Sequence, residues 1–318
     1  MTLDNILEEI KKAEKIAILT HETPDGDAIG SSLAFKLAIK QLGKEADVII
    51  PKYSRTFEFL PGAKEIKTDS EIKRYDLAIS VDCSDLKRLA KGEEYFVTAK
   101  TKIQVDHHSI NTMFADYNFV NPVAPACCEI LIGMFEYFGI EITPELGTCI
   151  ITGIITDTGG FQYAGVTDAT FELAAELLRK GINVSELYRR VLKIKTKPSF
   201  KLMKLAISRM EMFEEEKIAF TYLNDEDEKN VNAEIGDHEG IVDIGRDIEG
   251  VQVSIFIRER EDLKGYKVSL RSNGDINVAD LCFLLGGGGH KNAAGCTILG
   301  DIETVKNKIL TEVRKVLK

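Results

Sequence analysis

The chain has 318 residues, of which 44% are hydrophobic and 29% are charged. This balance is typical of a folded protein with one large or two ordinary domains, and it excludes a disordered chain. No apolar run approaches the roughly 20 residues of a membrane span, and the N-terminal segment lacks the apolar stretch of a signal peptide. We therefore expect a cytoplasmic protein with no membrane partner. The net charge of −10 argues against binding of long duplex nucleic acid, which normally needs a basic face.

Six cysteines lie at positions 83, 127, 128, 149, 282 and 296, and none belongs to a C-x-x-C pair. One interpretation is a disulfide framework or a zinc site. The other is a set of buried free thiols in a reducing compartment, and it is favoured because several of these cysteines lie inside apolar runs.

Strand and helix patterns alternate through the first two thirds of the chain. We expect strands at 15–19, 47–50, 76–81 and 102–105, and helices at 27–43, 126–139, 144–156, 168–180 and 184–192. This alternation predicts an α/β fold with a mostly parallel, doubly wound sheet that is covered on both faces.

The composition changes after residue 192. A basic stretch at 193–201, which contains Pro198, is predicted to link a first domain of residues 1–192 to a second domain of residues 202–318. Segments 217–223, 251–260 and 266–272 alternate with period two, which predicts strands with one face in solvent. The chain ends in an amphipathic helix from residue 302 to 318. The second domain is therefore expected to be a smaller α/β domain.

Side chains of the kind that bind metals follow three of the predicted strands. His21 comes after strand 15–19, Asp82 follows strand 76–81, and Asp106, His107 and His108 follow strand 102–105. Ligands of open α/β sheets bind beyond the carboxyl ends of the strands, so we expect these residues to lie together at one edge of the sheet.

Three further aspartates have two interpretations each. Asp25 and Asp27 have D-x-D spacing in the turn before helix 27–43, and Asp157 follows the apolar part of helix 144–156. They are either metal ligands, or a helix cap in the first case and a turn residue in the second.

Together these residues form a candidate metal-ligand set, which consists of His21, Asp25, Asp27, Asp82, His107 and Asp157. Four clustered carboxylates repel one another unless cations are bound, and four negative charges match two divalent ions. Carboxylates with a minority of imidazoles suit Mn²⁺, with Mg²⁺, Fe²⁺ and Co²⁺ as less favoured substitutes. Two such ions would activate a water and stabilise charge on a phosphoryl group, so the set predicts phosphoester hydrolysis.

Five segments carry a resemblance to a known family. HETPDGDAIGSSLAF, SVDCSDLKRL, QVDHHSIN and GIITDTGGFQY resemble, in order, the signature motifs of the DHH phosphoesterase superfamily. LLGGGGHKNAAGC resembles the glycine-rich motif of the DHH-associated C-terminal domain. The chain is most similar to the subfamily of bifunctional oligoribonucleases and 3′-phosphoadenosine 5′-phosphate (pAp) phosphatases. That subfamily also includes phosphodiesterases that act on cyclic di-AMP or on its linear product pApA.

The resemblance implies roles for individual residues of the first domain. One ion would be held by His21, Asp25 and Asp82, and the other by Asp27, Asp82, His107 and Asp157, with Asp82 as the bridge. His108 would face the substrate phosphate, and Asp106 would orient its neighbours.

The resemblance also implies that the second domain binds the substrate. In the family, the glycine loop faces the metals across an interdomain cleft; here it comprises Gly287, Gly288, Gly289 and the adjacent His290. Arg271 and Ser272 occupy the family's phosphate-contact position. Without the resemblance, the glycine run is a turn and Arg271 is a solvated strand end.

The expected substrates are RNA or DNA oligonucleotides of two to about five nucleotides, dinucleotides, and pAp. The alternative within the same chemistry is a cyclic di-AMP or pApA phosphodiesterase. A third alternative, from a different class, is a nucleotide-binding regulator that does not turn over its ligand. The intact set of metal ligands argues against it. A homodimer is compatible with the sequence, which does not determine the oligomeric state. His238, in an acidic stretch, is expected at the surface.

Overall fold

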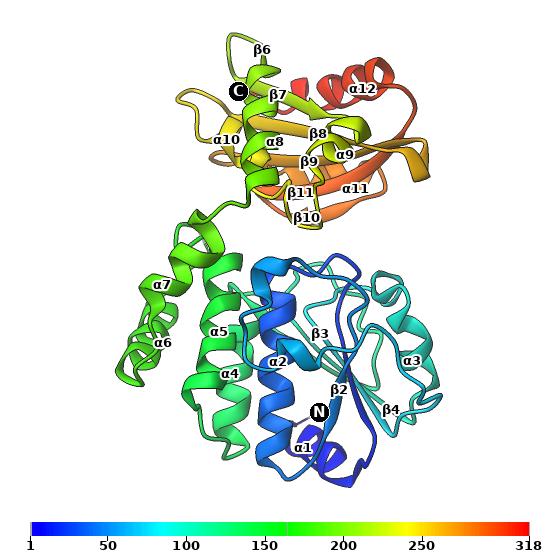
Figure 1. The fold of residues 1–318 in the computed structure, drawn as a ribbon, viewed down its shortest axis with the longest axis vertical. Coiled ribbons are helices and arrows are strands. Elements are labelled where there is room, and N and C mark those ends of the chain that lie inside the picture. Colours follow the sequence, from blue (N-terminus) through cyan, green and yellow to red (C-terminus); the bar gives the residue numbers. More distant parts are fainter. Residues whose placement is uncertain (1, 164, 318) are drawn as a thin grey trace. The chain divides into compact units, whose positions relative to one another are not determined.

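A computed structural model describes residues 2–163 and 165–317. The chain forms two compact units that divide between Ile194 and Lys195 (Figure 1). The segment predicted as a linker ends one unit and begins the other, and its last residues form the first turns of helix α8 (Lys197–Ser208). The hydroxyl of Thr196 accepts a hydrogen bond from Ser199 N and so caps this helix. Pro198 is tolerated in the first turn because its missing N–H would have no partner within the helix.

The first unit contains a parallel sheet of five strands in the order β2-β1-β3-β4-β5. The strands are β1 (Ile16–Leu19), β2 (Ala46–Val48), β3 (Leu77–Val81), β4 (Thr101–Asp106) and β5 (Tyr117–Val120). The sequence missed β5, because no helical pattern separates it from β4. The strand order reverses between β1 and β3, and this is the position where open α/β sheets bind their ligands.

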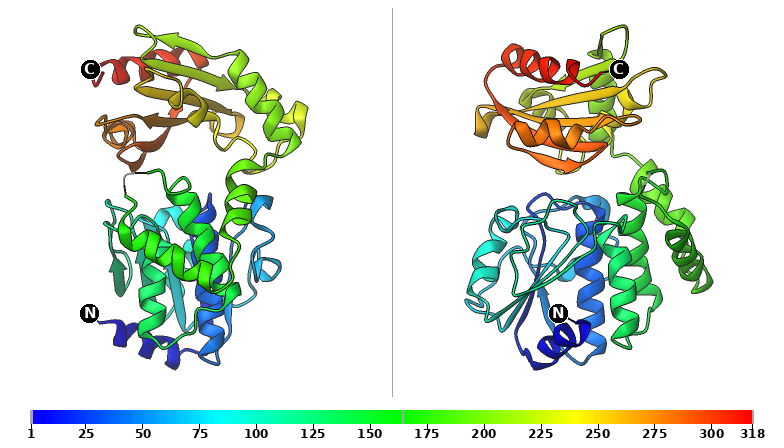
Figure 2. Two further views of the ribbon diagram at one scale, coloured as in Figure 1. Left: turned by 90° about the vertical axis from the view of Figure 1, so that its left-hand side faces the viewer. Right: turned by 180° about the vertical axis from the view of Figure 1, so that it is seen from behind.

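Helices cover both faces of this sheet, which confirms the predicted fold class. They are α1 (Leu3–Lys12), α2 (Gly26–Gln41), α3 (Gly92–Thr98), α4 (Cys127–Tyr137), α5 (Pro144–Asp157), α6 (Asp168–Arg179) and α7 (Val184–Tyr188), which continues into a π-helical turn at Arg189–Lys193. Figures 1 and 2 show α2, α4 and α5 side by side on one face, with α3 on the other. Alternation within each strand explains this arrangement, since Ile16 and Ile18 pack with the α2 side while Ala17 and Leu19 pack with α3.

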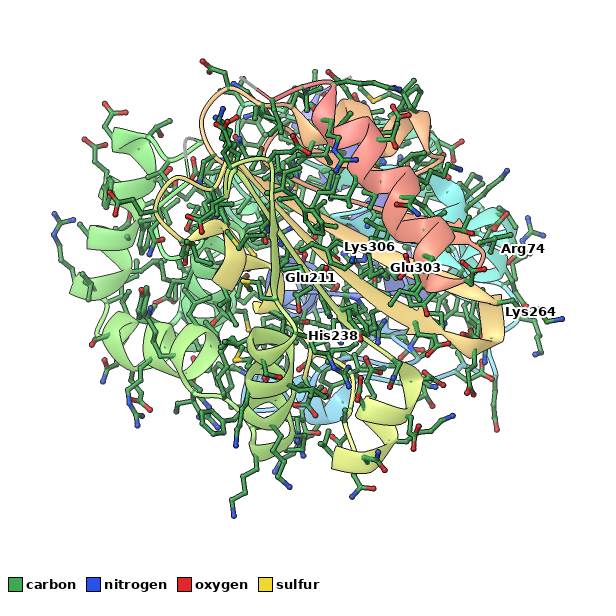
Figure 3. All side chains as sticks on the ribbon, turned by 90° about the horizontal axis from the view of Figure 1, so that it is seen from above. Arg74, Glu211, His238, Lys264, Glu303 and Lys306 are labelled. Atoms are coloured by element: carbon green, nitrogen blue, oxygen red, sulfur yellow. The ribbon has the colours of Figure 1, made fainter. Side chains whose placement is uncertain are left out.

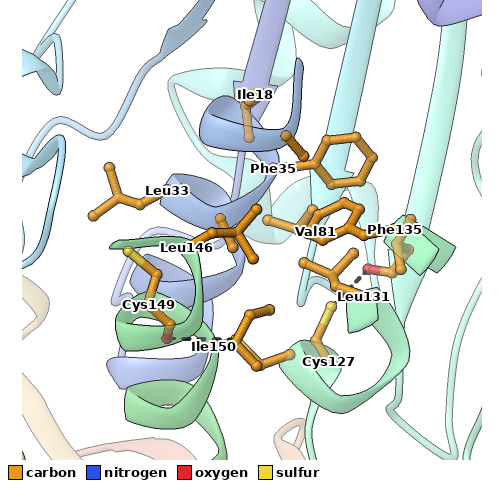
Figure 4. Close-up of a cluster of buried hydrophobic side chains, with 14 of the residues drawn as sticks. Ile18, Leu33, Phe35, Val81, Cys127, Leu131, Phe135, Leu146, Cys149 and Ile150 are labelled. Atoms are coloured by element: carbon orange, nitrogen blue, oxygen red, sulfur yellow. Dashed lines mark hydrogen bonds between the residues drawn. The ribbon is translucent and has the colours of Figure 1, made fainter. Parts of the chain in front are cut away.

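The core between the sheet and these helices is closely packed (Figure 4). Phe35 of α2 and Phe135 of α4 meet edge to face, with ring centroids 5.4 Å apart. Full burial of such side chains contributes about 1.5–3 kcal/mol each relative to exposure. All six cysteines are free and buried, as expected, and three of them, Cys127, Cys128 and Cys149, belong to this core.

The second unit contains a mixed sheet of six strands in the order β10-β11-β9-β8-β7-β6, in which only β7 and β8 pair in parallel. The strands are β6 (Glu211–Phe213), β7 (Ile218–Leu223), β8 (Val253–Arg260), β9 (Gly265–Ser272), β10 (Gly288–His290) and β11 (Ala293–Leu299). The helices besides α8 are α9 (Asp225–Val231), α10 (Ile241–Arg246), α11 (Val278–Leu284) and α12 (Ile302–Arg314). Lys318, the last residue of the predicted terminal helix, lies outside the described residues.

The expectation of one solvent face holds for only part of this sheet. Burial alternates along β9, but β7 and the first five residues of β8 are almost continuously buried. The reason is that α8 and α10 pack over one face of β7 and β8, while α11 and α12 cover the opposite face of the sheet. An ion pair of 2.7 Å between Lys306 of α12 and Glu211 of β6 lies at the sheet margin (Figure 3).

His238, which is labelled in Figure 3, is half-buried rather than exposed as expected. Burial, together with the charges of Arg258, Lys267 and Arg260, lowers the pKa of its imidazole to about 3. His238 is therefore a neutral side chain at neutral pH.

In the described part of the chain, every helix is too short or too polar to cross a membrane.

Candidate active site

The candidate site lies at the carboxyl edge of the parallel sheet, beside the switch point between β1 and β3. His21 lies two residues beyond the end of β1, and Asp82 follows β3 directly; their exposed fractions are 5% and 2%. Asp106, the last residue of β4, is fully buried. The three strand ends therefore bring their polar side chains to one edge, as predicted.

Asp25 caps a helix, and its position is also compatible with metal binding. As the residue that caps α2, its Oδ1 accepts hydrogen bonds from Asp27 N at 3.0 Å and Ala28 N at 3.1 Å. Its carboxylate also offers an oxygen within 4.8 Å of ligand atoms of both His21 and Asp82. A capping carboxylate still has free lone pairs, so capping does not exclude metal binding.

Asp27, in the first turn of α2, caps a different helix. Its Oδ2 accepts from Cys127 N at 2.5 Å and its Oδ1 from Cys128 N at 3.0 Å, at the N-terminus of α4. An anionic side chain is favoured there by the helix dipole. A carboxylate oxygen of Asp27 also lies within 4.8 Å of ligand atoms of Asp82 and His107.

Close helix packing makes this placement possible. A Cβ atom added to Gly153 of α5 would lie 2.5 Å from Asp27 Oδ1, and one added to Gly30 of α2 would lie 2.6 Å from the carbonyl oxygen of Cys149. Glycine at these two positions lets α2 and α5 approach until Asp27 and Asp157, the last residue of α5, reach the same site.

Asp82 is the centre of the cluster and belongs to both proposed ligand sets. Its Oδ2 lies 3.6 Å from His21 Nε2, and its Oδ1 lies 3.4 Å from His107 Nε2. Its backbone is left-handed, with φ of 49°, which is uncommon for a residue other than glycine. Such strained residues occur at functional sites where the surroundings hold them in place.

The imidazole of His107 is fixed by a hydrogen bond from one ring nitrogen to the backbone. Nδ1 lies 3.1 Å from the carbonyl oxygen of Ala124, and because a carbonyl only accepts, Nδ1 carries the proton. Nε2 then faces the carboxylates, 3.1 Å from Asp157 Oδ2 and 3.9 Å from Asp27 Oδ2. This is the usual arrangement of a metal-binding histidine, whose second nitrogen is fixed by a hydrogen bond.

His108 points to a different partner from its neighbour. Its Nδ1 lies 2.7 Å from Asp106 Oδ1, and Asp106 Oδ2 accepts a hydrogen bond of 2.6 Å from Asn111 Nδ2. His108 Nδ1 also lies 3.6 Å from Asp82 Oδ1, so both histidines neighbour Asp82, and they differ in their closest carboxylate, which is Asp157 for His107 and Asp106 for His108.

The electrostatics of the cluster are those of crowded carboxylates. Burial and the charges of Asp82 and Asp157 raise the pKa of Asp25 to about 6, and the same causes raise the pKa of Asp27 well above its usual range. Burial alone would raise the pKa of Asp82, but the adjacent imidazoles of His107, His21 and His108 hold it well below its usual value. Burial likewise opposes protonation of His107 and His108, yet the neighbouring carboxylates raise both pKa values.

These residues fit divalent cations. Among the described residues, Asp82 Oδ1 and His21 Nδ1 are buried polar atoms without a hydrogen-bond partner. Buried polar atoms are normally satisfied, so such exceptions call for a partner like an ion. The groups with ligand atoms close enough for a metal include His21 with Asp25 and Asp82, and Asp27 with Asp82 and His107.

In the second unit, Arg271 and His290 lie in one row across three strands. Arg271 of β9 pairs with Ala293 of β11, which pairs in turn with His290 of β10. Directly paired residues project from the same face of a sheet, so the side chains of Arg271 and His290 share a face. The Arg271 guanidinium forms an ion pair with Asp243 of α10, in which Nε lies 3.3 Å from Oδ1.

The glycine run forms part of a hairpin rather than an irregular loop. Gly289 has φ of 145°, and a Cβ atom there would lie 2.5 Å from the carbonyl oxygen of Ala293, so only glycine fits. Gly287 packs against Gly295 and Cys296 of β11 in the same way, while Gly288 has open space around its Cα. The backbone of β10 is therefore accessible to a close-fitting ligand group.

Ser272 is buried, and its hydroxyl donates a hydrogen bond of 2.7 Å to the carbonyl oxygen of Ile276. Asn292 Nδ2 donates to the same hydroxyl at 3.0 Å. The side chain thus holds the turn that follows β9, and its contact with substrate stays a prediction.

Comparisons with known proteins identify the family of each unit. Residues 15–154 match the model of the DHH family, N-terminal domain, and residues 214–318 match the DHHA1 domain. The bifunctional oligoribonuclease and PAP phosphatase NrnA of Thermus thermophilus is 35% identical, and the alignment covers 98% of this chain and 94% of that protein. The chain belongs to the DHH family.

Further DHH-family similarity comes from a solved structure and from a longer relative. The crystal structure of an exopolyphosphatase-related protein from Bacteroides fragilis superposes with a TM-score of 0.88 at 30% identity, covering 98% of this chain and 95% of that one. Cyclic-di-AMP phosphodiesterase PdeA of Listeria monocytogenes is 27% identical over 93% of this chain, which spans 46% of that relative.

Sequence reasoning missed three contacts of the candidate residues, two in the first unit and one in the second. Asn111 lies inside the segment QVDHHSIN, so its position was visible but its contact with Asp106 was not. No sequence motif marks the carbonyl group of Ala124, which contacts His107, or the carboxylate of Asp243, which contacts Arg271. Each contact forms only in the tertiary fold.

Proposed function

We propose that this DHH-family protein is a metal-dependent phosphoesterase. It hydrolyses oligonucleotides of two to about five nucleotides to mononucleotides, and it converts pAp to AMP. The observation that carries the proposal is the sharing of Asp82 by two carboxylate–imidazole groups, one with His21 and Asp25 and one with Asp27 and His107. Two adjacent sites with a common carboxylate suit a pair of divalent ions.

The proposed ligand sets are those that the family resemblance implies. His21, Asp25 and Asp82 would hold one ion, and Asp27, Asp82, His107 and Asp157 would hold the other. Mn²⁺ suits these donors best, because oxygen predominates, imidazole is in the minority and cysteine thiols are absent from the sets. When bound, the ion pair supplies an activated water and neutralises charge on the phosphoryl group.

The remaining residues bind and orient the substrate. His108, held by Asp106 at 2.7 Å, would donate a hydrogen bond to a phosphate oxygen and stabilise the charge that develops there. Arg271 and His290, on one face of the second sheet, would bind a further phosphate together with the backbone of Gly287, Gly288 and Gly289.

The substrate class rests on two supports. Over nearly its full length this chain is similar to a protein named for oligoribonuclease and PAP phosphatase activity. The net charge of −10 disfavours long nucleic acid, because each added nucleotide would meet repulsion and few new cationic contacts.

A second candidate is a cyclic di-AMP or pApA phosphodiesterase, favoured by the similarity to PdeA. The chemistry is the same, and the candidates differ in the nucleotide that is preferred. Product chromatography from pAp, pApA, cyclic di-AMP and a five-nucleotide RNA with added Mn²⁺ distinguishes them.

In that experiment, AMP from pAp and mononucleotides from RNA support the first candidate. Turnover of cyclic di-AMP with little RNA cleavage supports the second. Binding of all four compounds without multiple turnover contradicts both and would indicate a nucleotide-binding regulator. Asp82→Asn protein is the control for contaminating phosphatases, since it preserves the size of the side chain but removes the shared carboxylate.

A further inference from the structure

Asn111 lies in the turn after β4 and contacts the carboxylate behind His108. Asp106 is fully buried, and each of its carboxylate oxygens has one side-chain partner: Oδ1 faces His108 Nδ1 at 2.7 Å, and Oδ2 accepts from Asn111 Nδ2 at 2.6 Å. A buried carboxylate with an unsatisfied oxygen would carry a large desolvation cost. The Asn111 amide therefore fixes the rotation of the Asp106 carboxylate about its Cβ–Cγ bond.

The orientation of the Asn111 amide follows from its two contacts. Its Oδ1 accepts a hydrogen bond of 2.7 Å from Met113 N, and a backbone N–H can only donate. The amide nitrogen must then face Asp106, where the carboxylate can only accept. Both contacts agree on one orientation, so the donor to Asp106 is the amide N–H.

The turn that carries Asn111 is anchored separately. Thr112 N and Thr112 Oγ1 both donate to the carbonyl oxygen of Ser84, at 3.0 and 3.2 Å. Ser84 lies two residues beyond Asp82, so this anchor joins the loop after β4 to the loop after β3. Anchoring by Thr112 and orientation by Asn111 are two functions that substitution can separate.

We infer that Asn111 is a positioning residue for phosphoester hydrolysis, which acts through Asp106 to hold His108 in the orientation that meets the substrate phosphate. The inference rests on the proposed function. Asn111 neither binds metal nor touches substrate in this scheme, so its loss should lower kcat while leaving KM and bound metal unchanged. Partners that orient active-site side chains in this way typically contribute about 10- to 100-fold in activity.

The test compares three variants in the full-length protein. Asn111→Ala removes both amide contacts. Asn111→Asp keeps an oxygen for Met113 N but replaces the N–H donor with a carboxylate oxygen, which repels Asp106. Thr112→Val, the matched control, removes one anchoring bond and leaves the Asn111 amide in place. Kinetics on pApA, Mn²⁺ content and thermal unfolding are measured for each.

We expect both Asn111 variants to lose about 10- to 100-fold in kcat, with KM and Mn²⁺ content within about twofold of the unchanged protein. Thr112→Val should retain its kcat. Unchanged kcat in Asn111→Asp would overturn the inference, as would an equal loss of kcat in Thr112→Val. A fall in Mn²⁺ content that accounts for the lost rate would overturn it as well.

A second measurement does not depend on turnover. In metal-free protein, the hydrogen-bonded Nδ1–H proton of His108 should give a downfield NMR resonance, assigned by its absence in His108→Gln. We expect this resonance to shift or to exchange faster in both Asn111 variants and to persist in Thr112→Val. An unchanged resonance in Asn111→Ala would overturn the inference. Absence of turnover in the unsubstituted protein would instead contradict the proposed function. The NMR result would still test the contact between Asn111 and Asp106, because it does not depend on turnover.

Discussion

His107 Nε2 lies 3.4 Å from Oδ1 of Asp82, a buried oxygen without a hydrogen bond among the described residues. The other oxygen of the same carboxylate lies 3.6 Å from His21 Nε2, so two imidazoles from different strand ends converge on one side chain. A carboxylate with one ligand group on each side is suited to bridge two cations.

The first prediction concerns this bridge. Asp82→Ala should lose measurable turnover and more bound Mn²⁺ than Asp157→Ala, because it opens both coordination sites and Asp157→Ala opens one. Elemental analysis of the two purified proteins, with turnover on pApA, gives the comparison. Near-normal Mn²⁺ content and turnover in Asp82→Ala would refute the shared role.

The second prediction concerns the adjacent histidines. His107→Ala should lose metal affinity, because Nε2 of His107 faces the carboxylates. His108→Ala should keep its metal and lose about 10²–10³-fold in kcat, the typical cost of one lost donor to transition-state charge. Metal titration and steady-state kinetics are measured on both. Identical behaviour of the two variants in both measurements would contradict the division of roles.

The third prediction concerns Arg271 and the carboxylate behind it. Arg271→Ala should raise KM for pAp about 10-fold with little change in kcat, because it removes binding shared by the ground and transition states. Asp243→Asn should raise KM by a smaller factor, since the guanidinium remains but loses its ion pair. Arg314→Ala is the control: it removes another paired arginine of the same unit, from its contact with Glu214. A KM change in that control equal to the one in Arg271→Ala would show that the effect is not local.

The fourth prediction concerns substrate length. We expect kcat/KM to fall steeply for RNAs longer than about five nucleotides, because proteins that follow long strands use an extended positive groove. The measurement is kcat/KM for RNAs of two to about 24 nucleotides, at low and moderate salt. Equal or rising efficiency with length would indicate a processive exonuclease of the same superfamily.

The fifth prediction concerns stability and pH. Asp76 accepts hydrogen bonds from Lys100 Nζ at 2.6 Å and from Lys15 N at 3.0 Å, and these contacts lower the pKa of its carboxyl to about 2. A depressed pKa means that the folded state favours the ionised form, so this stabilisation is present above pH of about 4 and disappears as the pH falls toward the folded-state pKa.

Asp76→Asn should therefore lower the free energy of unfolding by about 1 kcal/mol at neutral pH, a value reduced by solvent screening of this partly exposed side chain. The difference from the unsubstituted protein should shrink as the pH falls below about 4. Urea unfolding of both proteins across this pH range is the measurement. A difference that stays constant with pH would show that the charge of Asp76 is not its cause.

The sequence by itself predicted the parallel sheet and the candidate ligands, because both depend on short-range patterns. Apolar runs of strand length define β1, β3 and β4, and the residues that end those strands must lie at one sheet edge in any parallel arrangement. His21, Asp82 and His107 were therefore identifiable without coordinates. The motif resemblance implied which ion each residue would bind, with Asp82 shared by both, and the pattern alone left this open.

The tertiary structure decided how these side chains are held. Asp27 and Asp157 reach the site because glycines at positions 30 and 153 let α2 and α5 approach closely. Packing of α8 and α10, which period-two alternation could not reveal, buries the second face of β7 and of the start of β8. The contacts from Asn111 to Asp106 and from Asp243 to Arg271 depend on loop geometry and helix placement. Local periodicity determines which residues form each element, whereas the orientation of a side chain is set by neighbours that are distant in sequence and come close only when the core packs.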